Sequence, residues 1–173
     1  MKNTHIFKRS LRISIISVLL IGVAALVFIH YYNQEKVRQE FLAKGIYEIQ
    51  GNFTWIMRDN SLSAYYMICQ PPSDRDELIQ LVLQYIQENN IVQELQKREP
   101  DHNVDETSLW FIEPSKTFPI GWDSKEPEGW ASNGDSMNNH LLISVTIPRN
   151  AQSQSDYLII VGNNDNMEIV KLP

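Results

Sequence analysis

The chain opens with a long apolar run and continues as short segments in which apolar and polar positions alternate. Residues 13–29 read ISIISVLLIGVAALVFI, broken only by two serines and a glycine, and Tyr31 and Tyr32 follow. At about 1.5 Å of rise per residue, a helix over residues 13–32 spans a hydrocarbon core of roughly 30 Å. Tyrosines at its end fit the membrane interface. The pattern predicts a single transmembrane helix.

Basic residues flank this segment unequally. Four of them precede it and three follow it before residue 46: Lys2, Lys8, Arg9 and Arg12, then Lys36, Arg38 and Lys44. The positive-inside rule therefore favours a cytoplasmic tail at residues 1–12 and a C-terminal domain outside the cytoplasm. The alternative is a cleaved signal peptide, because residues 23–25 read VAA, a small-residue cleavage pattern. The apolar run continues past that point, which favours an uncleaved signal anchor.

Residues 33–44, NQEKVRQEFLAK, are mostly good helix formers, and Gly45 follows as a typical helix stop. We expect residues 33–45 to form a helical stalk that continues the membrane helix. Residues 46–173 are then the folded extracytoplasmic domain.

That domain begins with a period of two. Apolar side chains alternate with polar ones from Tyr47 to Met57 and again from Leu62 to Ile68, which predicts an antiparallel hairpin. From residue 74 to residue 97 the apolar spacing becomes three and four, the pattern of one long helix with a buried face. Ser73 or Asp74 can cap that helix, where Asp74 with Glu77 would form an acidic capping box, and Asn89-Asn90 is a candidate interruption.

Strands return after this helix. Residues 108–112, SLWFI, predict a third strand, and Leu141 to Ile147 alternates again. The continuous run from Tyr157 to Val161 is typical of a central strand, and Met167 to Leu172 forms the last. We therefore expect an α+β domain, in which one long helix packs on an antiparallel sheet of five or six strands.

The charge and cysteine content narrow the function. The 15 Lys and Arg are outnumbered by 21 Asp and Glu, giving a net charge of −6. An acidic surface repels phosphate backbones, so we expect no nucleic-acid partner. The single cysteine, Cys69, cannot form an internal disulfide, and the fold must rest on its core.

Catalytic and metal motifs are absent from the sequence. The four histidines are scattered, and neither a phosphate-binding loop nor a nucleophile elbow occurs. Cys69 with His102 or His140 could supply a nucleophile and its base, but a buried thiol is the commoner state. A carboxylate pair for glycoside hydrolysis could come from Glu113, Asp123, Glu126 and Glu128, although acids in a polar loop are usually solvated. We expect no metal and no cofactor.

One segment stands out as a candidate binding surface. Residues 114–139 are too long for an ordinary connection and carry Phe118, Trp122 and Trp130. These rings either cover the sheet as a packed loop or face a ligand. Trp122 follows Pro119-Ile120-Gly121 and is expected to sit in a tight structural turn. Trp130 lies among small polar residues and is the better candidate for exposure.

These observations favour a non-enzymatic binding or accessory module at the cell envelope, held by its N-terminal membrane helix. Its expected partner is an envelope protein, a peptide or a glycan. Two alternatives remain, an envelope enzyme acting on glycan or peptide and a subunit of a membrane complex. Gly22 and Ala25 would favour the complex if they line a helix contact.

Overall fold

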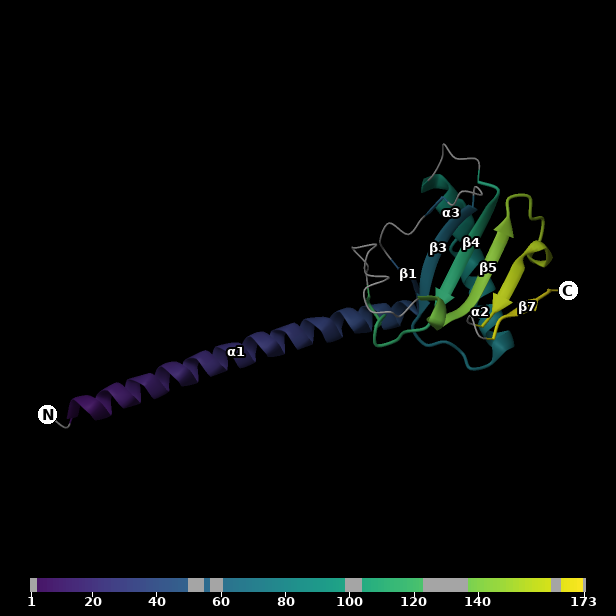
Figure 1. Cartoon of the computed structure of the whole chain (residues 1–173). Coiled ribbons are helices and arrows are strands. Elements are labelled where there is room, and N and C mark those ends of the chain that lie inside the picture. Colours follow the sequence, from purple (N-terminus) through teal and green to yellow (C-terminus); the bar gives the residue numbers. More distant parts are fainter. Residues whose placement is uncertain are drawn as a thin grey trace. The chain divides into compact units, whose positions relative to one another are not determined.

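The computed structural model describes residues 3–49, 55–56, 61–98, 104–122, 137–162 and 166–172 (Figure 1). The chain divides into two units, Met1–Glu40 and Phe41–Pro173. The first unit is almost entirely helix, and the second contains all the strands. The α+β class predicted from the sequence is confirmed.

The first helix, α1, runs without a break from Asn3 to Lys44. Its side chains from Val18 to Tyr32 are exposed, although most of them are large and apolar. By its length and its composition, α1 could cross a membrane. A signal sequence can share this length and composition.

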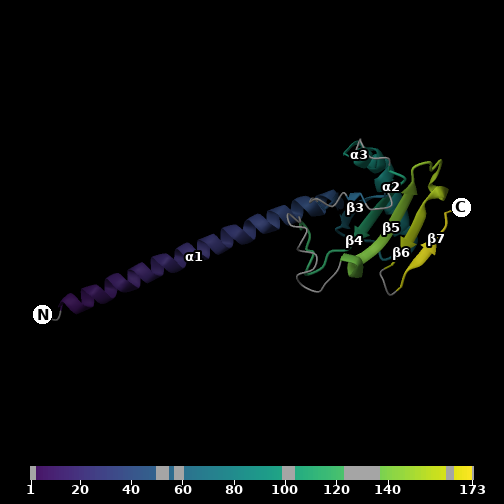
Figure 2. The same ribbon diagram turned by 45° about the horizontal axis from the view of Figure 1, so that its top comes forward.

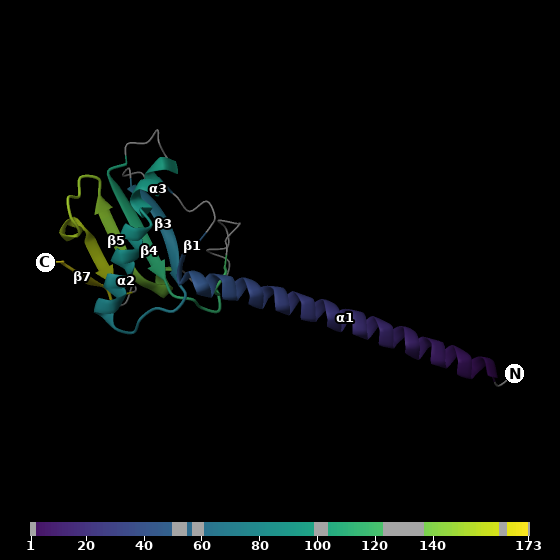
Figure 3. The same cartoon turned by 180° about the vertical axis from the view of Figure 1, so that it is seen from behind.

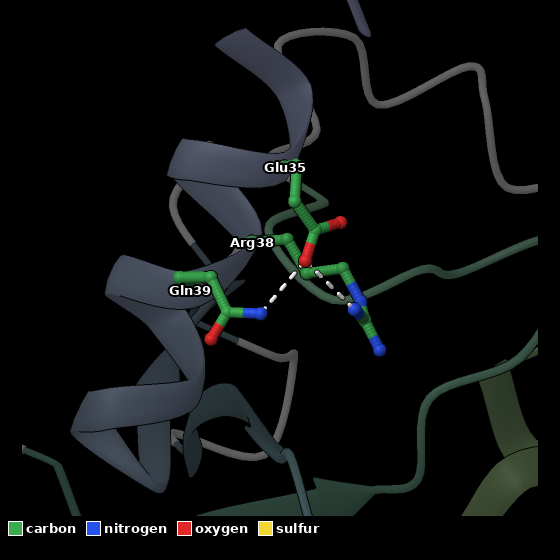
Figure 4. A network of polar contacts seen from close by, with 3 residues as sticks. All are labelled: Glu35, Arg38 and Gln39. Carbon is green, nitrogen blue, oxygen red and sulfur yellow. Dashed lines mark hydrogen bonds and ion pairs between the residues drawn. The ribbon is translucent and has the colours of Figure 1, made fainter. Parts of the chain in front are cut away.

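Beyond the apolar part, α1 is polar and contains side-chain hydrogen bonds between successive turns. Glu35 Oε1 accepts hydrogen bonds from Gln39 Nε2 at 2.7 Å and from Arg38 Nη1 at 3.2 Å (Figure 4). Gln34 and His30 form a further pair at 3.0 Å, one turn apart. Side-chain pairs at these spacings stabilise an isolated helix by a few tenths of a kcal/mol each. Residues 33–44 are helical, as expected, and these local interactions stabilise them.

The second unit is built on one sheet with the strand order β1-β3-β4-β5-β6-β7, and the two-residue β2 pairs separately with β3. The strands are Ile46–Glu48, Trp55–Ile56, Ser61–Ile68, Glu106–Ile112, Leu141–Pro148, Leu158–Val161 and Glu168–Val170, numbered β1 to β7. Figure 2 shows β3 to β7 side by side in this order. β1 and β2 both pair antiparallel with β3, as the predicted hairpin requires.

One pair of strands departs from the antiparallel expectation. β3 and β4 are parallel, with Leu62 opposite Thr107 and Tyr66 opposite Phe111. Two helices, α2 (Arg75–Glu88) and α3 (Ile91–Arg98), make the connection between them. A crossover of this kind is what returns the chain to the same end of a sheet. The run from Tyr157 to Val161 is also not central, because its strand β6 lies next to the edge strand β7.

The single long helix predicted over residues 74–97 is in fact two helices. Asp74 caps α2, where its Oδ1 accepts from the Glu77 backbone N–H at 2.9 Å. The break falls at the predicted interruption, because Asn90 adopts a positive φ of 50°, which a helix interior does not allow. Both helices lie against one face of the sheet, as the opposite views of Figures 1 and 3 show.

The sheet has a hydrophobic core on each face. The larger core lies between the sheet and the helices and contains Val82, Leu95, Leu109 and Ile143. The smaller core lies on the opposite face and contains seven buried residues: Tyr47, Ile49, Met67, Cys69, Ile112, Phe118 and Leu141. Phe41 and Leu42, from the last turn of α1, pack against this smaller core. The candidate site lies beside the short strand β1 and is lined by residues of both cores.

Candidate functional site

The segment after β4 is a hydrogen-bonded loop over its described part. The backbone N–H of Ser115 donates to Phe118 O at 2.9 Å, and the Phe118 N–H donates to Ser115 Oγ at 3.0 Å. Phe118 is only 1% exposed, and its ring meets the rings of Trp122 and His140 edge-on at 5.0 and 5.6 Å. This part of the loop is a packed cover over the smaller core.

Trp122 is held by the tight turn that the sequence predicts. Its backbone N–H donates to Pro119 O at 2.8 Å, and Gly121 has a φ of 82°. A positive φ at the third position is the geometry of a type II turn, which glycine adopts without strain. The indole is thereby carried to the edge of the smaller core, where it is half-buried.

Tyr47 of β1 ties this turn to the sheet. The Gly121 N–H donates to Tyr47 Oη at 2.9 Å, and the Tyr47 hydroxyl donates to Met67 Sδ at 3.0 Å. Tyr47 is 5% exposed, so both bonds lie in a largely dry environment. A buried hydroxyl with both roles used is costly to move, which fixes the turn relative to β1.

The last turn of α1 forms a second side of the same region. The rings of Phe41 and Tyr47 lie 4.3 Å apart, and Lys44 Nζ stands 4.5 Å above the Phe41 ring. The helix ends at Gly45, which has a φ of 71° and donates its N–H to Leu42 O at 3.1 Å. A left-handed glycine is the commonest helix terminator, and here it turns the chain directly into β1.

Cys69 secures this helix end. Its Sγ donates to the Phe41 carbonyl at 3.3 Å, and its backbone N–H donates to Gly45 O at 2.8 Å. The last carbonyls of a helix have no partner within the helix, so the Cys69 thiol, directly after β3, satisfies one of them. Burial raises the pKa of the Cys69 thiol and keeps it protonated. Its described role is structural and needs no histidine.

A third side is formed by charged and phenolic groups on the helix side of β1. Arg98 of α3 forms a bidentate ion pair with Glu48, in which Nη1 donates to Oε1 at 2.5 Å and Nη2 donates to Oε2 at 2.8 Å. Burial, reinforced by the Glu48 charge, raises the pKa of Tyr85 to about 12. The Tyr85 hydroxyl is therefore a neutral hydrogen-bond donor at physiological pH.

These three sides enclose a cavity of about 410 Å³, which we call the aromatic pocket. It is lined by Phe41, Lys44, Ile46, Tyr47, Glu48, Tyr85 and Trp122. The volume is within the range of small-molecule sites, and the lining combines ring faces with a few polar groups, as such sites do. The arrangement can hold and orient a ligand.

The three candidate residues from the sequence have different positions. Trp122 lines the aromatic pocket, and Phe118 lies behind it as a core residue that braces its ring. Trp130 lies outside the described residues. Sequence reasoning missed Phe41, Tyr47 and Tyr85, because each has the local pattern of an ordinary core residue and only the fold brings them together.

The alternative catalytic groups do not assemble among the described residues. Within the described ranges, no group of three His, Cys, Asp or Glu side chains is placed to hold a metal ion. Glu113 is exposed, while Asp123, Glu126, Glu128 and His102 lie outside the described part of the chain.

A larger hollow of about 660 Å³ lies elsewhere, between α2, the 3-10 helix η3 (Gln154–Asp156) and β7. Asp76 and Lys171 are the charged residues of its described lining, and no aromatic ring faces it. A neighbouring hollow of about 430 Å³ shares Leu83, Ser153 and Gln154 with it. Neither offers the combination of rings and opposite charges found in the aromatic pocket.

Comparison of the chain with models of protein families, with curated proteins and with solved structures found no match in any of the three.

Proposed function

We propose that the chain is a membrane-anchored binding module of the cell envelope, which holds an extracytoplasmic ligand in the aromatic pocket without transforming it. The observation that carries this proposal is the placement of Trp122. A type II turn, held by the Tyr47 hydroxyl, carries its half-buried indole into the lining of the aromatic pocket. Fixed aromatic rings of this kind are the usual anchors of binding sites, because they provide contact area at little entropic cost.

The anchoring part of the proposal rests on α1. Its apolar side chains between Val18 and Tyr32 are exposed to the extent of 53–69% where they are large, which is costly in water and favourable in lipid. The excess of basic residues before this segment favours the pocket-bearing unit on the outer side.

A labelling experiment tests the orientation. An amine reagent that cannot cross membranes is expected to modify Lys97 in intact cells or spheroplasts, because the Lys97 side chain is 70% exposed. Lys2 and Lys8 are the internal controls, because they should react only after lysis. Reaction of Lys97 only after lysis would place the pocket in the cytoplasm and exclude the proposal. Lys125 is a second target on the same side, outside the described residues.

A binding experiment tests the pocket. The full-length chain in lipid nanodiscs is incubated with washed cell-envelope material, and the bound fraction is compared between Trp122→Ala and Trp110→Phe. Trp110 stacks on Tyr65 at 5.9 Å, and it is not among the residues that line the aromatic pocket, so it is a matched control. We expect Trp122→Ala to lose binding and Trp110→Phe to retain it. Equal binding by both variants would remove the pocket from the proposal.

A further inference from the structure

The aromatic pocket is lined by a cation, Lys44, that forms no ion pair with another described residue. Lys44 Nζ lies over the Phe41 ring, and none of the ion pairs between described residues includes it. A cation over a ring face keeps its N–H groups available for an acceptor. Because the chain as a whole carries a net charge of −6, this positive position is a local feature of the pocket. It favours a ligand that brings a negative group.

The lining also offers a carboxylate, that of Glu48, held in a fixed orientation. Arg98 engages both oxygens of Glu48, and the Glu48 side chain is 26% exposed. Each carboxylate oxygen has a further lone pair, so Glu48 can still accept from a ligand hydroxyl. The Tyr85 hydroxyl beside it can donate. Neighbouring groups that accept and donate suit hydroxyls, which do both.

Ring faces complete the lining. Trp122 is half-buried, and Phe41 and Tyr47 form a tilted pair with their centroids 4.3 Å apart. A volume of about 410 Å³ holds one ring-sized group rather than a folded segment. The ligand should therefore be compact, with an apolar face for the rings and polar groups around its edge.

We propose that the aromatic pocket binds a sugar unit that carries a carboxylate, such as a uronic acid. The C–H face of the pyranose lies against Trp122, its hydroxyls bond to Glu48 and Tyr85, and its carboxylate accepts from Lys44. A peptide fits less well, because each of its amides needs a separate donor and acceptor, and the Tyr47 hydroxyl already uses both of its roles. This inference rests on the proposed binding function and specifies its ligand class.

The test uses the full-length chain in nanodiscs and isothermal titration calorimetry with three probes. Glucuronate carries the carboxylate, glucose has the same ring without it, and trialanine is a peptide of similar size. We expect glucuronate to bind about tenfold or more tightly than glucose, as charged hydrogen bonds usually contribute. We expect Lys44→Gln to remove that preference. Lys36→Gln, on the exposed surface of α1, is the matched control and should keep it.

A glucuronate oligomer, titrated beside the monomer, separates a free sugar acid from a polymeric source. Tighter binding of the oligomer would identify an acidic glycan as the ligand. Equal binding of oligomer and monomer would identify a free sugar acid. Either result supports the inference. It is overturned if glucose binds as tightly as glucuronate, if trialanine binds in preference, or if Lys44→Gln leaves the preference unchanged. In those cases envelope binding that depends on Trp122 still stands. Loss of that dependence would instead remove the proposed function itself.

Discussion

Replacing Phe118 by alanine tests whether the loop after β4 is a structural cover. The side chain is 1% exposed and braces Trp122 at 5.0 Å. A buried phenylalanine removes roughly 150–250 Å² from water, which at about 25 cal/mol per Å² gives an upper limit of ~4–6 kcal/mol. Truncations of buried aromatic residues typically cost about 3–5 kcal/mol. We therefore expect Phe118→Ala to destabilise the fold by ~3–5 kcal/mol.

The assay is thermal unfolding of the full-length chain in nanodiscs, followed by near-ultraviolet circular dichroism. For a domain of this size, such a loss lowers Tm by on the order of 10–20 °C. Phe118→Leu keeps most of the apolar volume and should recover more than half of the loss. Lys116→Ala, at an exposed position of the same loop, should stay within about 0.5 kcal/mol of wild type.

Trp122→Ala should fall between these limits. Its indole is half-buried, so we expect a loss of roughly 2 kcal/mol, together with loss of ligand binding. If Phe118→Ala unfolds at the wild-type temperature, residues 113–122 do not pack on the smaller core. Trp122 would then not be held beside the aromatic pocket by this loop.

Three further outcomes are expected. Val82→Asp should unfold the second unit, because it forces an unpaired charge into a fully buried position. Leu81 is only partly buried, so Leu81→Asp should lower the free energy of unfolding by less. Urea titration measures both changes. The pKa of Tyr85, raised to about 12 by burial and Glu48, exceeds the unfolded value of about 10, so its contribution to stability is complete below pH 10 and is lost as the pH rises towards 12. Tyr85→Phe should flatten that decline in urea midpoints measured from pH 9 to pH 12, and an unchanged slope would contradict the assigned shift. Gly45→Ala should cost about 1 kcal/mol through its φ of 71° alone, because its Cβ would meet open space; a loss above ~3 kcal/mol would show that the helix end is more crowded than described.

Much of the fold could be predicted because its signals are local. Asp74, the spacing of Val82 and Ile86, and the alternation in β5 are each encoded within a few residues. The parallel pairing of β3 with β4 could not be predicted in the same way. It depends on how α2 and α3 cross the sheet, and no local pattern specifies which strand a crossover will join.

Only part of the candidate site could be predicted from the sequence, because most of its residues are brought together by contacts between distant segments. Trp122 drew attention because an aromatic residue in a long polar loop is locally unusual. Phe41, Tyr47 and Tyr85 are locally ordinary, since each fits the apolar pattern of its own helix or strand. Their meeting depends on Gly45, which turns α1 into β1, and on the pairing of β1 with β3.

The contact between Cys69 and the Phe41 carbonyl makes the chain its own reporter of local opening. Cys69 is the only cysteine, it is 5% exposed, and burial raises the pKa of its thiol. We therefore expect a thiol reagent to reach it when the last turn of α1 separates from Cys69. The ratio of its labelling rate to that of a free thiol gives the free energy of this separation. Opening at the base of the pocket can thus be followed on the unmodified protein, with and without a candidate ligand.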